Sequence, residues 1–180
     1  MRCGRNSPEL KRELKFAATV SCAFSCYLSL VTGHPAFTFG AVSRKHKRIA
    51  ALVEAHQGHK LNQHYVGYFH CFNCQLFYEA HEVLEHIWLK DKHGPNGLFY
   101  KGLIQLAGAF VHLQRNHPQP AASLLKLALA NFEEYPREHE HLNLDSTRRM
   151  IRDWLADLEQ SHFRTNPLND GNVPKLKLEA

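Results

Sequence analysis

The chain has 180 residues, of which 44% are hydrophobic and 22% are charged. This composition is typical of a globular protein and excludes a disordered or collagen-like chain. The length fits one ordinary domain with extensions. The net charge of +5 is uneven, because residues 1–60 carry ten Lys and Arg against three Asp and Glu, whereas residues 61–180 carry twelve against fourteen. The basic character belongs to the first third of the chain, so we expect no specific nucleic-acid partner.

Residues 16–32 form the one long apolar run of the chain, and this run follows Arg12 and Lys15. Its length and its positive flank fit the core of a signal peptide and reach the lower limit for a membrane span. Its apolar residues also keep helical spacing, so an additional helix ahead of the domain is the other interpretation. We expect a cytoplasmic protein with no membrane partner unless this segment acts as an anchor. Residues 33–42 are predicted to be a linker.

Helical spacing continues from residue 43 to residue 160, interrupted by turn residues. The predicted helices are Ser43 to about His56, His64 to Phe72, Leu76 to about Leu89, Leu98 to about Gln114, Ala121 to Phe132, and a last helix capped by Asp145 or Ser146. Residues 1–42 are then an N-terminal extension. Residues 161–180 are predicted to be an irregular tail, which Leu176 and Leu178 could anchor to the helices. We predict an all-α fold, a compact orthogonal bundle of about five to six helices with an N-terminal extension.

Within the helix predicted from Leu76 to about Leu89, the stretch 77–88 divides into an apolar half and a half rich in histidine and glutamate. His81 and Glu85 stand one turn apart, and Glu82 lies beside both. Glu79 shares the same half. A solvated helix face would explain this pattern equally well, so the helix alone does not decide between solvent and a site.

The following helix favours a site. Residues 98–114 are apolar nearly all round, which predicts a buried helix. Gln105 and His112 are seven residues apart on one side of it, and buried polar groups must find partners. We expect those partners to be the carboxylates and His81 of the preceding helix. His81 and His112 would then lie within one bridging ligand or water of each other, with Gln105 lining the same cavity.

The usual metal motifs fit this chain poorly. His81 to Glu85 reads HExxE, in which glutamate replaces the second histidine of the zincin motif. The Glu-x-x-His pair of di-iron bundles occurs only at Glu138 to His141, in a predicted loop. An atypical site remains open, and its predicted ligands are His81, Glu82, Glu85 and His112. Oxygen-rich ligation would favour manganese or iron over zinc among the divalent metals that could serve as cofactor.

Three stretches of the sequence resemble a known family, catalogued as domain of unknown function 309. The stretches are Phe72-Asn73, Phe77 to Glu85 with Trp88, and Phe99 to Ala107, within a match from about His64 to Leu158. The resemblance implies a small helical orthogonal bundle, with Glu79, His81, Glu82, Glu85 and Gln105 in the family signature. Cys74-Gln75 replaces a turn that often contains glycine in the family, and residues 1–42 have no counterpart. The family has no assigned reaction.

Three functions follow as hypotheses. The first is a domain that binds a small molecule or a metal ion in a pocket formed by Glu79, His81, Glu82, Glu85, Gln105 and His112. The second is a metal-assisted hydrolase with Glu82 or Glu85 as general base. The third is a structural polar network that fixes the register of two helices and binds nothing. The sequence does not predict an oligomeric state.

Overall fold

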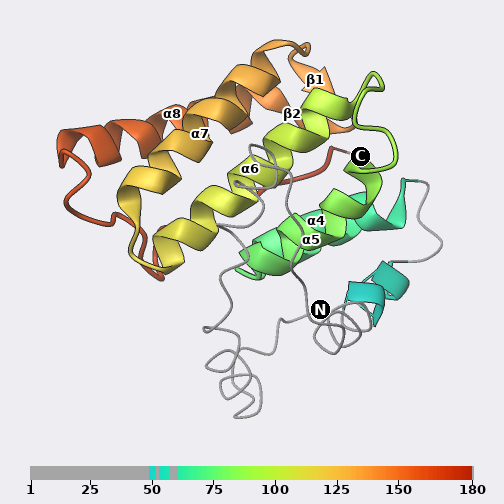
Figure 1. The fold of residues 1–180 in the computed structure, drawn as a ribbon, viewed down its shortest axis with the longest axis horizontal. Helices are drawn as coiled ribbons and strands as arrows, with labels where there is room; N and C mark the ends of the chain where they lie inside the picture. Colours follow the sequence, from blue (N-terminus) through green and yellow to red (C-terminus); the bar gives the residue numbers. More distant parts are fainter. Residues whose placement is uncertain (1–48, 52, 57–60, 180) are drawn as a thin grey trace, which may run out of the picture. The chain divides into compact units, whose positions relative to one another are not determined.

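The computed structural model describes residues 49–51, 53–56 and 61–179, and the regular secondary structure of this part is almost entirely helical. Its named helices are α4 (Gln63–Asn73), α5 (Phe77–Trp88), α6 (Gly97–Gln114), α7 (Pro118–Glu133) and α8 (Leu144–Gln160) (Figure 1). A pair of two-residue strands, β1 (Glu138–His139) and β2 (Leu142–Asn143), connects α7 to α8. The predicted all-α fold is therefore confirmed.

Several predictions concern residues outside this described part. The apolar run at residues 16–32, the linker at 33–42 and the cap at Ser43 all lie there, so the boundaries of the domain and its extension stay predictions. Among the described residues, none of the helices has both the length and the apolar character that crossing a membrane requires.

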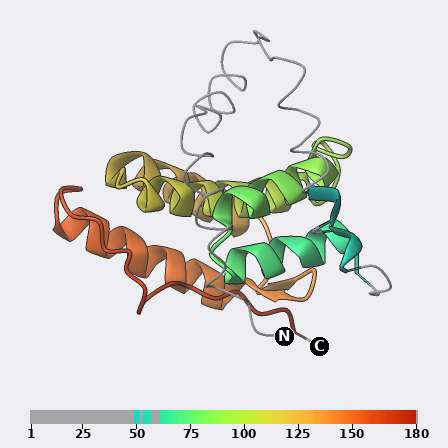
Figure 2. The same ribbon diagram turned by 90° about the horizontal axis from the view of Figure 1, so that it is seen from below.

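The helices pack in chain order, α4 on α5, α5 on α6, α6 on α7 and α7 on α8 (Figures 1 and 2). One chain of aromatic rings passes through four of them. Phe72 of α4 contacts Phe77 of α5 with ring centroids 5.0 Å apart, Phe77 contacts Phe110 of α6 at 5.1 Å, and Phe110 contacts Trp154 of α8 at 5.1 Å. Burial of such large apolar rings dominates the energetics of a core. The ring chain thus connects α4, α5, α6 and α8 through the core.

The close approach of α6 and α7 depends on a glycine in the signature stretch. A Cβ atom at Gly102 would lie 2.7 Å from the ring of Phe132, closer than packed atoms can stand. On the other side of α6, the buried Tyr68 hydroxyl of α4 donates a hydrogen bond of 2.8 Å to the carbonyl oxygen of Leu103. Burial raises the pKa of Tyr68 well above its ordinary value, so this hydroxyl stays a donor. These two contacts hold α6 in the middle of the bundle.

Two predicted helix starts differ from the structure. Helix α7 begins at Pro118 rather than at Ala121, because proline in the first turn needs no hydrogen-bond partner and already has a helical φ. Helix α8 is capped by Asn143, whose Oδ1 accepts from the backbone N–H of Ser146 at 3.0 Å. The predicted caps Asp145 and Ser146 therefore lie inside the first turn of α8.

The segment from Glu138 to His141 is a short hairpin rather than an irregular loop. Glu138 and His139 form β1, and the backbone turns with φ values of 47° and 62° at Glu140 and His141. No alternation of apolar and polar residues indicates this hairpin, because each strand has only two residues.

The C-terminal tail is docked, as predicted. Leu176 is 5% exposed, and its backbone N–H and carbonyl oxygen both bond to the side-chain amide of Asn73, at 2.8 and 2.7 Å. Leu178 pairs with Leu142 of β2 through an isolated bridge. Asn73 of the signature stretch therefore has a structural role, which is to hold the tail against the end of α4.

Candidate metal centre

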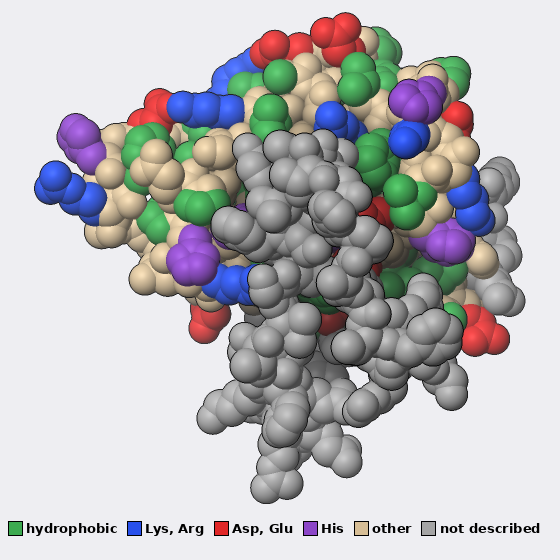
Figure 3. Space-filling view, viewed as in Figure 1, with side chains coloured by type: hydrophobic (Ala, Val, Ile, Leu, Met, Phe, Trp, Pro, Cys, Tyr) green, Lys and Arg blue, Asp and Glu red, His purple; other side chains and the backbone are tan. Residues whose placement is uncertain are grey.

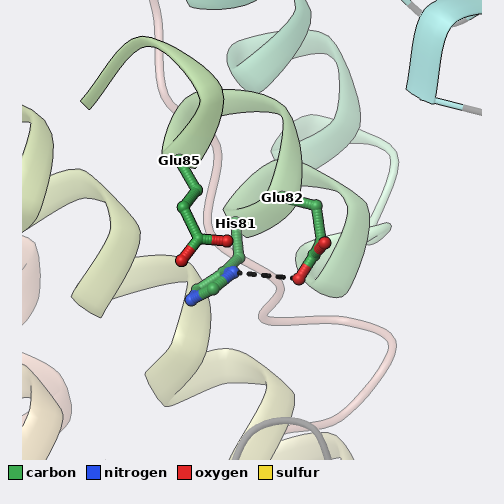
Figure 4. A group of neighbouring side chains, drawn as sticks. All are labelled: His81, Glu82 and Glu85. Carbon is green, nitrogen blue, oxygen red and sulfur yellow. Dashed lines mark ion pairs between the residues drawn. The ribbon is translucent and has the colours of Figure 1, made fainter. Parts of the chain in front are cut away.

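The structure brings three of the predicted site residues together on α5. His81, Glu82 and Glu85 each offer one ligand atom, and these atoms all lie within 4.8 Å of one another (Figure 4). The grouping follows from helix geometry, since 3.6 residues per turn place residues 81 and 85 one above the other, with residue 82 beside them. Val83 and Leu84 on the other half of the helix are fully buried and hold α5 in this orientation.

The imidazole of His81 lies close to a carboxylate without forming a hydrogen bond to it. The distance from His81 Nδ1 to Glu82 Oε1 is 3.6 Å, longer than a normal N–H···O bond. Nδ1 is buried and has no hydrogen-bond partner in the described part of the chain. The side chain of His81 is 17% exposed and that of Glu82 is 5% exposed. A buried polar atom in this position costs free energy until something binds it, which favours a ligand site.

The donor set is one imidazole nitrogen with carboxylate oxygens. Manganese, iron and zinc all accept this combination in proteins. Three protein ligands leave positions on the metal for water or a small molecule, as in catalytic rather than structural metal sites. The chemistry of the three side chains therefore fits a divalent metal.

Gln105 makes its hydrogen bond on the opposite side of α6. Its Oε1 accepts from Nδ2 of Asn131 on α7, at 2.6 Å. A Cβ atom at Gly108 would lie 3.2 Å from Leu124 of α7, so this stretch of α6 faces the same helix. The place of Gln105 in the predicted cavity stays a prediction, but the hydrogen bond that the structure gives it is to α7 and not to α5. The reason is that α6 is wedged between two helices, and an apolar surface all round does not indicate which neighbour receives the amide.

His112 lies near the end of α6, beside another histidine. Its ring centroid is 6.1 Å from that of His117, and it is not part of the group within 4.8 Å on α5. Burial lowers the pKa of His112, and the positive charges of His117 and Arg115 lower it further. Glu79 is 8% exposed in the first turn of α5. The ligand roles of Glu79, Gln105 and His112 stay predictions.

A second group of polar side chains had no signal in the sequence. His64 of α4 and His86 of α5 stack with their ring centroids 4.6 Å apart and their planes inclined by 5°. The two residues come from different helices, so no spacing rule connects them. In the space-filling view, the visible histidines of the described part lie in separate places, and acidic and basic side chains are interspersed (Figure 3).

The fold and the site define a small all-helical domain with a His/Glu group on one of its central helices. Residues 65–124 match the family described as "Domain of unknown function (DUF309)", so the resemblance is confirmed over these residues.

Two curated relatives share parts of the chain. An "Uncharacterized protein" of Aquifex aeolicus (strain VF5) is 31% identical over 108 residues, which cover 60% of this chain and 29% of that protein. "Uncharacterized protein YpuF" of Bacillus subtilis (strain 168) is 31% identical over 87 residues, 48% of this chain and 47% of that protein. The matches thus span less than half the length of either relative. No solved structure gives a significant match.

Proposed function

We propose that the domain binds a divalent metal ion through His81, Glu82 and Glu85. The observation that carries the proposal is the convergence of three ligand atoms within 4.8 Å, beside a buried imidazole nitrogen that has no hydrogen-bond partner in the described part. Manganese and iron suit the two carboxylates best, and zinc is the third candidate.

The electrostatics of α5 support a cation at this place. Two carboxylates one turn or less apart on a helix repel each other when both are ionised, and a dication removes this repulsion. A neutral imidazole adds one nitrogen ligand without adding charge. Three protein ligands leave positions on the metal where a small molecule can bind. The same site could therefore bind a metal ion alone or a small molecule through the metal.

Metal binding by purified protein tests the proposal. Protein prepared without a chelator or a histidine tag is titrated with Mn²⁺, Fe²⁺ and Zn²⁺, by calorimetry and by thermal unfolding. Glu85→Gln keeps the shape and removes the charge, and we expect it to weaken binding by about tenfold or more, as changes around metal sites commonly do. The matched control is Glu133→Gln on α7, an exposed carboxylate that should leave binding unchanged. Unfolding that ignores all three metals would contradict the proposal.

Metal-assisted hydrolysis is a second candidate on the same residues. The observation that favours it is the small number of protein ligands, which leaves room for water and substrate. Glu82 or Glu85 would deprotonate the attacking water. Phosphatase, esterase and amidase screens with added metal test this function. An activity that is unchanged in Glu82→Gln and Glu85→Gln would remove it.

A further inference from the structure

A pocket of about 390 Å³ lies where α4 begins and α5 ends. Its walls include Leu61, Asn62, His64, His86, Ile87 and Lys90. Volumes of about 300–1,000 Å³ are usual for sites that hold small molecules. The pocket shares α5 with the metal group but uses none of its three residues, so the two sites are separate.

The polar lining of this pocket is basic. The stacked rings of His64 and His86 form one part of the wall, and Lys90 follows His86 by one helical turn. No acidic residue occurs among the described residues that line it. Burial lowers the pKa of His64, and the positive charges of His86 and Lys90 lower it further, so the pocket disfavours additional positive charge.

Two helix ends meet at this pocket. Helix α4, of 11 residues, begins there with the partial positive charge of its N-terminus, and α5 ends there with the partial negative charge of its C-terminus, so the two largely offset each other and Lys90 carries the full positive charge of the lining. The side chain of Asn62 caps the backbone N–H of His64 at 2.9 Å, which fixes the start of the helix. Leu61 and Ile87 give the pocket an apolar part next to these donors.

We propose that this pocket binds the phosphate group of a small phosphorylated organic molecule. Lys90 contributes a full positive charge, and the imidazoles and the amide of Asn62 contribute further donors to a tetrahedral anion with several acceptor oxygens. Leu61 and Ile87 contact the organic part. The volume of about 390 Å³ fits a small molecule.

Titration of the full chain with inorganic phosphate and with phenyl phosphate tests the proposal. The protein is treated with a chelator, so that phosphate held through a metal at His81 does not contribute, and chloride keeps the ionic strength constant. We expect saturable shifts of the His64 and His86 ring resonances by NMR, with tighter binding of phenyl phosphate because it also contacts the apolar wall. Lys90→Gln should weaken both by about tenfold, as loss of a charge-assisted hydrogen bond does. The control Lys92→Gln, an exposed lysine outside the lining, should leave both unchanged.

Three outcomes would overturn the proposal. The first is the absence of a saturable shift with either phosphate. The second is equal weakening by Lys90→Gln and Lys92→Gln, which would indicate general attraction of anions to a basic surface. The third is a saturable shift with Zn²⁺ alone, which would make the histidine pair a metal site instead.

Discussion

Two polar groups in this domain differ in how completely they are bonded. Arg148 of α8 is nearly buried, and one of its terminal nitrogens donates to the carbonyl oxygens of Phe132 and Tyr135 at 2.5 and 2.6 Å. Its other terminal nitrogen donates to Asp145 at 3.1 Å, and its Nε alone has no hydrogen-bond partner in the described part. The His81 group of α5, by contrast, has a buried nitrogen 3.6 Å from its nearest carboxylate oxygen.

The difference separates a polar group that stabilises the fold from one that is suited to a ligand. The guanidinium of Arg148 bonds to the carbonyl oxygen of Phe132, in the last turn of α7, and to that of Tyr135, just beyond the helix, and so helps to fix where α7 ends. The His81 group fixes no carbonyl that the structure shows. It leaves a buried imidazole nitrogen of His81 without a hydrogen-bond partner in the described part of the chain, which a bound ligand would supply. Three experiments test this difference.

The largest effect is expected for Arg148→Met. Methionine keeps much of the packed stem but removes the charged donor to the carbonyl oxygens of Phe132 and Tyr135 and to the carboxylate of Asp145, so the free energy of unfolding should fall by about 3 kcal/mol. Urea unfolding measures it. Arg152→Met is the control, because Arg152 is exposed and its ion pair with Glu133 at 3.7 Å should contribute less than about 0.5 kcal/mol. Equal losses in the two variants would refute a structural role for Arg148.

A smaller effect is expected when the α5 group is truncated. His81→Ala and Glu85→Ala, each measured in metal-free buffer, should change the free energy of unfolding by less than about 1 kcal/mol or increase it, since sites for ligands often cost stability. The same melts decide the structural hypothesis. A loss of several kcal/mol in both variants is what a buried hydrogen-bond network predicts, and that result would assign the group to the fold rather than to a ligand.

The smallest effect concerns pH. The pKa of His64 is lowered by burial and by His86 and Lys90, and the pKa of His139 is lowered by burial. Between the folded pKa and the ordinary value of 6.5, the unfolded chain therefore binds more protons, so the stability of the fold declines as pH falls through this window. Melts at pH 7.5 and 5.5 in phosphate-free buffer should show the decline. His64→Asn should make it shallower, and the exposed control His93→Asn should not. Identical pH dependence in both variants would contradict the assignment.

Much of the fold could be predicted because the sequence carries clear helical periods. The apolar spacing of residues 98–114 identified the buried central helix, and the two-sided pattern of residues 77–88 identified which half carries the polar group. Each pattern is a local property of one helix, and a helical wheel is enough to describe it. The convergence of His81, Glu82 and Glu85 could be predicted for the same reason, because all three lie on a single helix.

Contacts between helices could not be predicted in this way. Gln105 has two neighbouring helices, and only the packing of α6 on α7 selects Asn131 as its partner. Arg148 has the spacing of a residue on an amphipathic helix, yet it is buried because the end of α7 requires donors. The stacking of His64 on His86 likewise depends on how α4 meets α5. In each case the deciding partner is remote in sequence and leaves no local pattern.

The tail contact has a consequence for how this chain acquires its structure during synthesis. Asn73 and Leu176 are 103 residues apart, and the bridge from Leu178 to Leu142 is also made by the last residues. Helices α4 to α7 each pack on the preceding one, so they can form progressively as the chain emerges from the ribosome. The hydrogen bonds of Asn73 to the tail form only after Leu176 has emerged. The docking of the tail therefore follows the packing of α4 to α7.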